Sequence, residues 1–325
     1  MAIGLGGGGY VGIAFETTMG TYVAPSVYIP ILSESLAYTE DRYLSPAIRK
    51  ATMVSDVRQG FYHVEGDMDW EVDPTYAPYF MHIARLSVAK TGTTPNFTYT
   101  YTPSSGASGA GVATTKTASI TIVRNARVFK YVGCVVTSFN YRVEDGILKS
   151  NMTIMGMGET GANGDTPPTP TFTDPVLMGA ASHTVFTGAV ANSPTEPTWA
   201  QVNDFQGFTY NHNDNGSAQN RIRPDRQASY IAMGETEATI TSTLDFQDRL
   251  EYENFVATTT KAIKLESLNT ATRGVKISAF RTVYTAYPVN LPGMGDIVTA
   301  DAEMRVLLQN TRSTRIEVLS PTDIT

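Results

Sequence analysis

The sequence is short of cysteine and of long apolar runs, and each scarcity excludes a class of protein. Cys134 is the single cysteine in 325 residues, so an internal disulfide framework is impossible. Its apolar neighbours in 132–136 would raise the thiol pKa, which favours a buried side chain over a nucleophile. No apolar run approaches the ~20 residues of a membrane helix, and the first residues lack the pattern of a secretory signal. We expect no membrane association.

Basic side chains are also outnumbered. The chain carries 24 Lys and Arg against 31 Asp and Glu, which gives a net charge of -7. An acidic protein repels phosphate groups, so binding of nucleic acid would require a concentrated basic patch. The sequence contains no such patch, which excludes a specific nucleic-acid binder.

Motifs for catalysis and for metal or cofactor binding are missing as well. No histidine pair has the spacing of a zinc site, and no cysteine cluster accompanies the four histidines, which are His63, His82, His183 and His212. Residues 211–216 (NHNDNG) are typical of a polar turn rather than a metal site. Gly4, Gly6 and Gly9 have dinucleotide-site spacing, but no strand precedes them. We expect no catalytic residue, no cofactor and no metal.

The pattern that is present is β alternation. In 63–73, Val64, Met68, Trp70 and Val72 point to one side, with Gly66 among them. The opposite side carries an acidic ladder, which consists of Glu65, Asp67, Asp69, Glu71 and Asp73. A second strand pair is predicted over 135–154, where Asp145-Gly146 is a strong hairpin signal. The composition, rich in Thr, Val, Tyr, Ser and Gly, predicts a mainly β fold.

The second half repeats this plan. Residues 238–246 alternate like 64–72, and a short helical segment follows each strand, over 74–83 and 247–256. We match strand 118–123 with 275–280 and the hairpin 128–154 with 283–308. In the second half, the counterpart of the acidic ladder is neutral and consists of Thr239, Thr241 and Thr243.

Composition also predicts the division of the chain. We expect an extended N-terminal arm over 1–27, a first β domain over 28–158, a Gly/Pro linker over 159–170 and a second β domain over 171–325. Residues 91–116 are rich in Ser, Thr and Gly and are predicted to form a long loop. The predicted fold is two tandem β-sandwich or barrel domains, each with a short flanking helix.

The acidic ladder has several interpretations. Side chains two apart on a strand lie roughly 6.5–7 Å apart, so a straight strand spreads carboxylates too widely for a calcium loop. A solvated or Lys/Arg-paired face is the plainest alternative. A negatively charged channel lining is the third, and the threonines of the second half would then add neutral bands to it.

The sequence resembles the tail tube proteins of long-tailed, non-contractile (siphovirus-type) phages. The resemblance is carried by residues 16–25 (ETTMGTYVAP), 28–36 (YIPILSESL), 64–67 (VEGD) and 131–136 (YVGCVV), and by Glu144-Asp145-Gly146. Arg42 and residues 45–49 (SPAIR) extend it, whereas the second half matches more loosely, mainly in 243–246 (TLDF). The family has no catalytic residues to transfer.

The resemblance implies a virion structural protein whose domains join into one β-barrel around a hollow lumen. With two tube domains in each chain, three chains would complete a pseudo-sixfold ring, so we expect a trimer, with a hexamer as the alternative. Rings would stack into a tube in contact with tape measure, terminator and distal tail proteins. Double-stranded DNA would pass through without specific binding, after assembly in the cytoplasm of the bacterial host.

Other functions fit less well. A tail terminator or a head decoration protein would also be a phage structural protein, but a terminator forms one ring and stops. A β-sandwich adhesin would be expected to expose clusters of Trp and Tyr. The chain has two Trp, and Trp70 is predicted to point inward.

Overall fold

The computed structural model describes residues 8–324, except 45–56, 104–115, 126, 163–164, 193–194, 223–224, 292, 295 and 311. It is mainly β, as predicted, and its strands are antiparallel in nearly every pairing. The helices α1 (Ala77–His82) and α2 (Leu250–Val256) lie within the two predicted helical segments. No helix in the described residues is long and apolar enough to cross a membrane.

The first half is a sandwich of two sheets that share one long strand, β9 (Arg127–Glu144). One sheet has the order β4 (Ala37–Leu44), β5 (Val57–Glu71), β10 (Ile147–Gly156) and β9. The other has the order β2 (Val27–Ile29), β1 (Tyr10–Phe15), β8 (Ala118–Arg124) and β9. Short β3 (Ser33–Glu34) and β11 (Gly158–Glu159) extend these sheets.

The second half has the same strand order around β19 (Arg273–Ala286). Its first sheet contains β14 (Phe208–Asn213), β17 (Glu237–Asp245), β21 (Thr299–Val306) and β19, which β20 (Val289–Asn290) continues. Its second sheet contains β13 (Ala200–Val202), β12 (His183–Ala189), β18 (Lys261–Thr270) and β19. Beside β19 lie β22 (Thr314–Ser320) and the hairpin of β6 (Leu86–Thr93) and β7 (Asn96–Pro103).

Two β-bulges occupy matching places in the two halves and fix the equivalence residue by residue. Between β9 and β10 the ladder skips Thr137, and between β19 and β21 it skips Thr285. The β8–β9 and β18–β19 ladders each carry one extra residue on the longer strand, before Cys134 and before Thr282. Bulges are specific features of a fold, so the duplication is confirmed.

The bulges also correct the predicted alignment of the repeat. They match β8 with β18, whereas the sequence pattern had matched 118–123 with 275–280. Residues 275–280 lie on β19 and are equivalent to the start of β9. Both segments are buried alternating strands, so the hydrophobic pattern could not separate them.

The alternation predicted for β5 is confirmed: Val64, Met68, Trp70 and Val72 are buried in the core. Gly66 is required because a Cβ there would lie 2.5 Å from the carbonyl oxygen of Ser35. The predicted hairpin turn is also present, with φ of 53° at Asp145 and 73° at Gly146. Both residues are thus in the left-handed region that two-residue hairpin turns require.

The prediction of an extended arm over residues 1–27 is wrong for the described part of that segment. β1 pairs with both β8 and β2, and Val11 and Ile13 are fully buried. Residues 16–25 are tied to this sheet by Glu16, whose carboxylate accepts hydrogen bonds from Gly20 N, Thr117 Oγ1, Ser119 Oγ and Gly133 N at 2.7–2.9 Å. Residues 1–7 lie outside the described residues.

The long loop predicted over 91–116 is also wrong in its first part. Residues 91–103 belong to the β6–β7 hairpin, which turns at Thr94-Pro95. Phe97, Tyr99 and Tyr101 of β7 are buried against the core, and β7 pairs with β22 of the second half. These three aromatic residues alternate with threonine, but the segment as a whole is rich in Ser, Thr and Gly, so its composition predicted a loop. Residues 104–115 lie outside the described residues.

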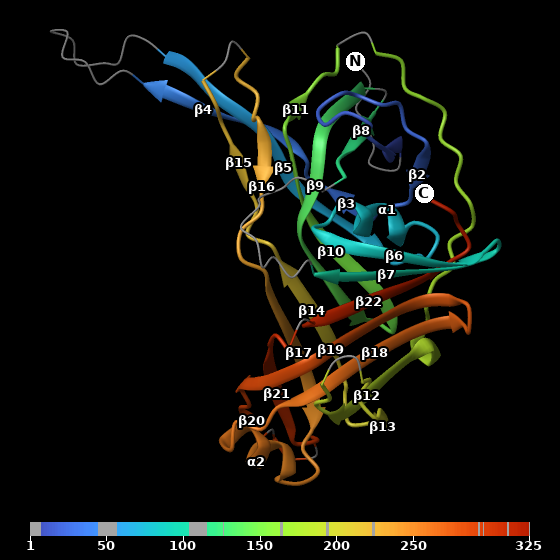
Figure 1. Cartoon of the computed structure of the whole chain (residues 1–325), viewed down its shortest axis with the longest axis vertical. Coiled ribbons are helices and arrows are strands. Elements are labelled where there is room, and N and C mark those ends of the chain that lie inside the picture. The colour runs from blue at the N-terminus through green and yellow to red at the C-terminus, as the bar shows by residue number, and fades with distance from the viewer. Residues whose placement is uncertain are drawn as a thin grey trace, which may run out of the picture.

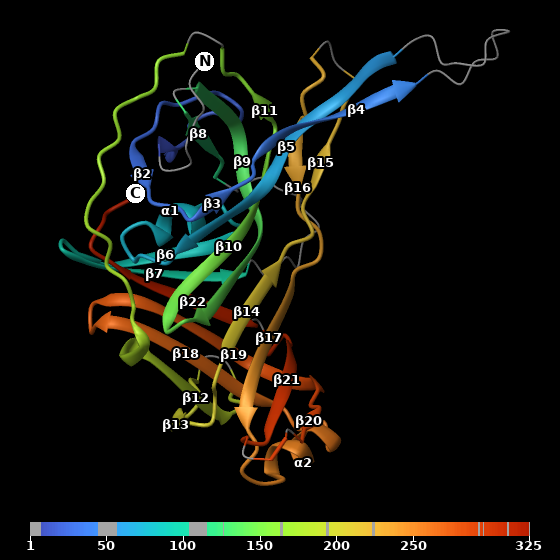
Figure 2. The same ribbon diagram turned by 180° about the vertical axis from the view of Figure 1, so that it is seen from behind.

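Figures 1 and 2 show the two halves end to end, with the first half above the second. β4 and the beginning of β5 extend away from the body as a projecting hairpin. Residues 160–179, apart from 163–164, contain no helix or strand and run down the outside of the first half. This arrangement places both β5 and β17 in one sheet that crosses the molecule.

Candidate channel-lining face

One sheet crosses from the first half to the second, and one of its faces is mostly polar, with buried Met155 and Val135 as an apolar patch beside Glu65. β14 pairs with the end of β9, so that the strand order is β4, β5, β10, β9, β14, β17 and β21. Residues paired across a ladder point to the same side. Starting from Asp67, the pairings lead through Thr153, Ser138, Asn213 and Glu237. We call this surface the polar face.

The opposite side of this sheet fixes the register, because it forms the core. Tyr141 and Tyr210 face one another across the β9–β14 pairing and are fully buried. A shift of one residue would exchange the two sides of a strand and bury the carboxylates. The alternation in the sequence therefore determines which side chains reach the polar face.

Four members of the acidic ladder lie on the polar face, where they are exposed or half-buried. They are Glu65, Asp67, Asp69 and Glu71. Asp67 accepts a hydrogen bond from Thr153 Oγ1 at 2.8 Å, and Asp69 pairs with Arg142 at 3.2 Å. The interpretation as a Lys/Arg-paired surface therefore applies to Asp69, whereas Asp67 has a neutral partner.

Asp73 is a correction to the predicted ladder. It lies beyond the end of β5 and is 2% exposed. Its carboxylate accepts hydrogen bonds from Thr75 N at 2.7 Å and Val176 N at 2.8 Å. Asp73 thus holds the start of the α1 segment to the connection between the halves. Alternation alone extended the strand too far, because the chain turns after Val72.

The three predicted threonines, Thr239, Thr241 and Thr243, lie on the polar face of β17. The neighbouring strand makes this region less neutral than predicted, since Thr241 pairs with Glu303 and Thr243 with Asp301. Thr243 Oγ1 donates to Asp301 Oδ1 at 3.0 Å. Sequence reasoning missed both carboxylates, although 299–306 (TADAEMRV) alternates in the same way as the ladder.

Basic side chains on the polar face lie close to carboxylates. Lys149 pairs with Glu144 at 3.3 Å, and Arg305 pairs with Glu237 at 2.9 Å. Hydrogen bonds from Lys149 and Arg142 lower the pKa of Glu144, which keeps this carboxyl ionised. The bases thus balance part of the acidic charge, and the ladder with Asp301 and Glu303 leaves the face acidic.

Alternative sites for chemistry have no support in the described residues. His212 belongs to β14 rather than to a turn, and it is buried with Nε2 3.3 Å from Asp214. No group of three His, Cys, Asp or Glu side chains in these residues could hold a metal. Burial raises the pKa of the Cys134 thiol far above neutrality, which makes it a poor nucleophile.

Comparison with known proteins identifies the family. A family model described as phage tail tube protein matches residues 6–306, so the chain belongs to the phage tail tube protein family. No curated protein sequence matches the chain. The predicted resemblance to phage tail tube proteins is thereby confirmed, and the chain is a structural protein of a phage tail.

Proposed function

We propose that this protein polymerises into stacked rings that form the hollow tail tube of a long-tailed, non-contractile phage. The observation that carries the proposal is the β9–β14 pairing, which joins the equivalent sheets of the two halves edge to edge. An edge-to-edge contact that repeats closes into a ring when its rotation divides a full turn. Each half therefore acts as one tube domain, and the chain already contains one of the joints.

A ring of six such domains needs three chains, and we propose the trimer over the hexamer. The support is the duplication itself, since two bulges and the whole strand order recur in each half. Six chains would give a ring of twelve domains, or would leave half of the domains outside the ring.

The polar face is the proposed wall of the channel. DNA moves freely past carboxylates because its phosphates are repelled, whereas basic contacts would add affinity through counterion release. The carboxylates of β5 and β21 and the threonines of β17 meet this requirement. The ion pairs of Arg142 and Arg305 reduce the basic charge available to phosphate.

The projecting hairpin is the proposed contact between stacked rings. The predicted arm and the predicted 91–116 loop are less suited to this contact, since β1 and β7 are both built into the fold. Tyr43, Leu44 and Val57, near its described end, are each more than half exposed. Exposed apolar side chains on a protruding element favour burial against another molecule. Tape measure, terminator and distal tail proteins are the further proposed partners, met during assembly in the host cytoplasm.

Electron microscopy tests this function. The purified, concentrated protein is expected to form hollow tubes in negative stain, and native mass spectrometry of released rings should give three chains. Single rings that never stack would favour a terminator. A strictly monomeric protein at high concentration and at every ionic strength would refute the proposal.

A further inference from the structure

The joint between the two halves shows in atomic detail how one tube domain holds the next. β14 pairs with β9 from Phe208 opposite Val143 to Asn213 opposite Ser138. The ladder continues through a hydrogen bond from Asp214 N to Thr137 O at 2.8 Å. His212 stacks on Phe139 with ring centroids 4.7 Å apart. We call this contact the internal joint.

The internal joint also contributes a side chain to the wall of a pocket in the second half. Val143 lines a cavity of about 250 Å³ together with β12 and residues 205–208. Beyond it, His183 Nε2 donates to the carbonyl oxygen of Gly146 at 3.2 Å, so the β9–β10 turn rests on the start of β12. The first half therefore supplies both a strand edge and an apolar side chain at the pocket, Val143, which we call the plug.

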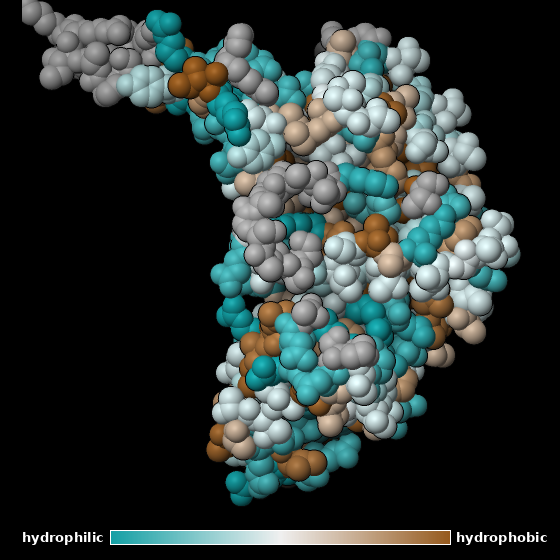
Figure 3. Space-filling view, in the orientation of Figure 1, coloured by the Kyte–Doolittle hydropathy of each residue, from teal (hydrophilic) through white to brown (hydrophobic). Residues whose placement is uncertain are grey.

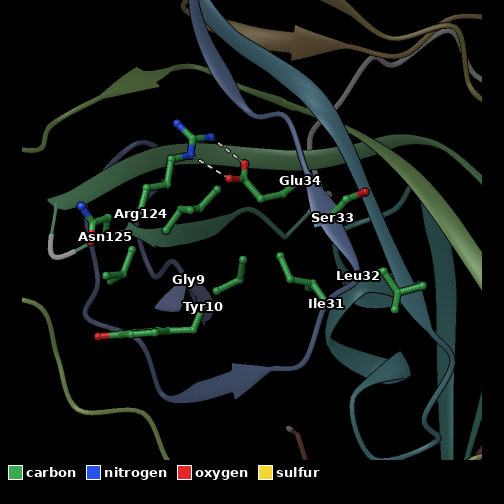
Figure 4. A pocket seen from close by; sticks show the side chains of 11 residues that line it. Gly9, Tyr10, Ile31, Leu32, Ser33, Glu34, Arg124 and Asn125 are labelled. Atoms are coloured by element: carbon green, nitrogen blue, oxygen red, sulfur yellow. Dashed lines mark hydrogen bonds and ion pairs between the residues drawn. The ribbon is translucent and has the colours of Figure 1, made fainter. Parts of the chain in front are cut away.

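The first half has an equivalent pocket without a plug from another domain. It measures about 390 Å³, and it is lined by β1, the end of β8 and residues 31–34 (Figure 4). Counting from the bulges, Val11 corresponds to Val185, Ile122 to Leu265 and Ser33 to Gly207. The corresponding residues line both pockets, and only the second pocket receives a side chain from β9.

The partner edges of a second joint are open. Within the described residues, β3 and β4 pair with β5 only, and β20 pairs with β21 only. The equivalent of Val143 is Leu291, which is 88% exposed. Figure 3 shows hydrophobic side chains at this lower end of the molecule, near α2 and β20. Met294 and Ile297, in the same loop, are also largely exposed.

We propose that residues 286–291 of one copy pair antiparallel with residues 34–39 of a second copy, in the register of the internal joint. Tyr287 then lies opposite Tyr38, and Asn290 lies opposite Ser35. Leu291 enters the open pocket of the second copy, as Val143 enters its equivalent within the chain. This inference rests on the proposed function and specifies the surface that closes the ring.

The backbone of both edges suits this register. Asp301 N donates to the carbonyl oxygen of Pro288 at 3.1 Å, so the polar groups of Pro288 face β21. Proline has no N–H, but at Pro288 that group would point toward β21, so the open edge loses no donor. The N–H groups of Tyr287 and Val289 point to the open edge. On the other edge, Ser35 N donates to Asp67 O at 2.9 Å, so the groups of Leu36 face outward.

Side chains close part of the β3–β4 edge in the single chain. Tyr131 Oη donates to the carbonyl oxygen of Leu36 at 3.2 Å, and Arg124 reaches the same oxygen while it pairs with Glu34. The equivalent of Arg124 is Ser267, so the second half lacks this cap. Leu36 N in turn donates to Glu34 Oε2 at 3.1 Å. When a copy docks, Val289 must displace this bond and one of the two donors to Leu36 O, and until then these contacts protect the edge.

Disulfide trapping tests the register. Ser35 and Asn290 are exposed, and in this register they form a non-hydrogen-bonded pair with Cα atoms about 4.5 Å apart, within disulfide range. The double variant Ser35→Cys, Asn290→Cys is expected to give covalent trimers under mild oxidation. The matched control, Thr39→Cys with Asn290→Cys, is four residues out of register, or roughly 13 Å, and should stay uncrosslinked. Native Cys134 is buried and does not interfere.

The outcomes separate the register from the function. Tubes that crosslink through 35 and 290 support both. Tubes that form without this crosslink, or that crosslink equally in the control, overturn the register and leave the function standing. A wild-type protein that never assembles overturns the function and the inference with it.

A second variant probes the plug. Leu291→Glu should reduce ring assembly at least tenfold while circular dichroism and melting temperature stay as in wild type. Val88→Glu on β6, also at an exposed apolar residue, is the control and should assemble normally. Normal assembly of Leu291→Glu would show that Leu291 does not enter the pocket of a second copy.

Discussion

The two halves of the chain share one strand order and two bulges, but one joining edge is paired within the chain and the other is open. In the internal joint, Tyr141 of β9 is fully buried opposite Tyr210. Its equivalent in the second half, Val289, is 39% exposed. In the proposed ring, duplication converts every second contact into an intramolecular one, whose formation requires no association of separate molecules. The remaining contact must wait for another copy.

The largest expected effect comes from breaking the internal joint. Tyr141→Ala should lower the free energy of unfolding by about 3–5 kcal/mol, because it removes a fully buried aromatic ring. Val289→Ala, at the equivalent residue, should cost under about 1 kcal/mol in the monomer and weaken assembly instead. Urea denaturation of the monomers measures both values. Equal losses would contradict the contrast between a closed and an open joint.

A smaller effect on stability is expected at Asp73, which follows β5, and at its equivalent Gln247, which follows β17. Asp73→Ala should cost about 2–3 kcal/mol, since it leaves the N–H groups of Thr75 and Val176 without their acceptor. Gln247 is exposed, and Gln247→Ala should change stability by less than about 0.5 kcal/mol. Thermal unfolding in matched buffers provides the measurement. If Asp73→Ala left the stability unchanged, Asp73 would be a solvated surface residue, as the ladder interpretation assumed.

The two helices should differ in their response to pH. Burial, with a smaller contribution from Lys116, lowers the pKa of His82 in α1 to about 4. The folded state therefore resists a proton that the unfolded chain accepts near pH 6.5, so stability present above pH 6.5 is lost as the pH falls toward 4. α2 has no buried residue. His82→Gln should reduce the drop in melting temperature between pH 7 and pH 4.5, and an unchanged drop would exclude His82 as its cause.

The smallest effect on stability, and the sharpest on function, is expected at the polar face. Asp67→Lys with Asp69→Lys should still permit tube assembly, but each new phosphate contact should add roughly -0.9 to the salt slope of DNA retention. Thr241→Lys with Thr243→Lys makes half the change in charge at equivalent residues and should retain DNA less. Infectivity and DNA binding by tubes report the effect. Normal infectivity of the Asp67/Asp69 variant would remove the ladder from the channel.

Much of the fold was predictable because strand faces are a local property. The alternation over 64–72 identified the buried side of β5, and Asp145-Gly146 identified the β9–β10 hairpin. Predictions failed where tertiary pairing overrode composition. β1 resembled an arm because of its glycine-rich start, and β7 resembled a loop because threonines separate its aromatic residues.

The sequence by itself determined that this chain is β-rich, duplicated and acidic, and which side chains of each strand point together. Only the tertiary structure decided that Asp301 and Glu303 lie beside Thr241 and Thr243, and that Asp73 leaves the ladder. It also decided which joint closes within the chain. Alternation is set by the backbone of one strand, whereas the neighbours of that strand come from distant segments, and their choice depends on packing of the whole core.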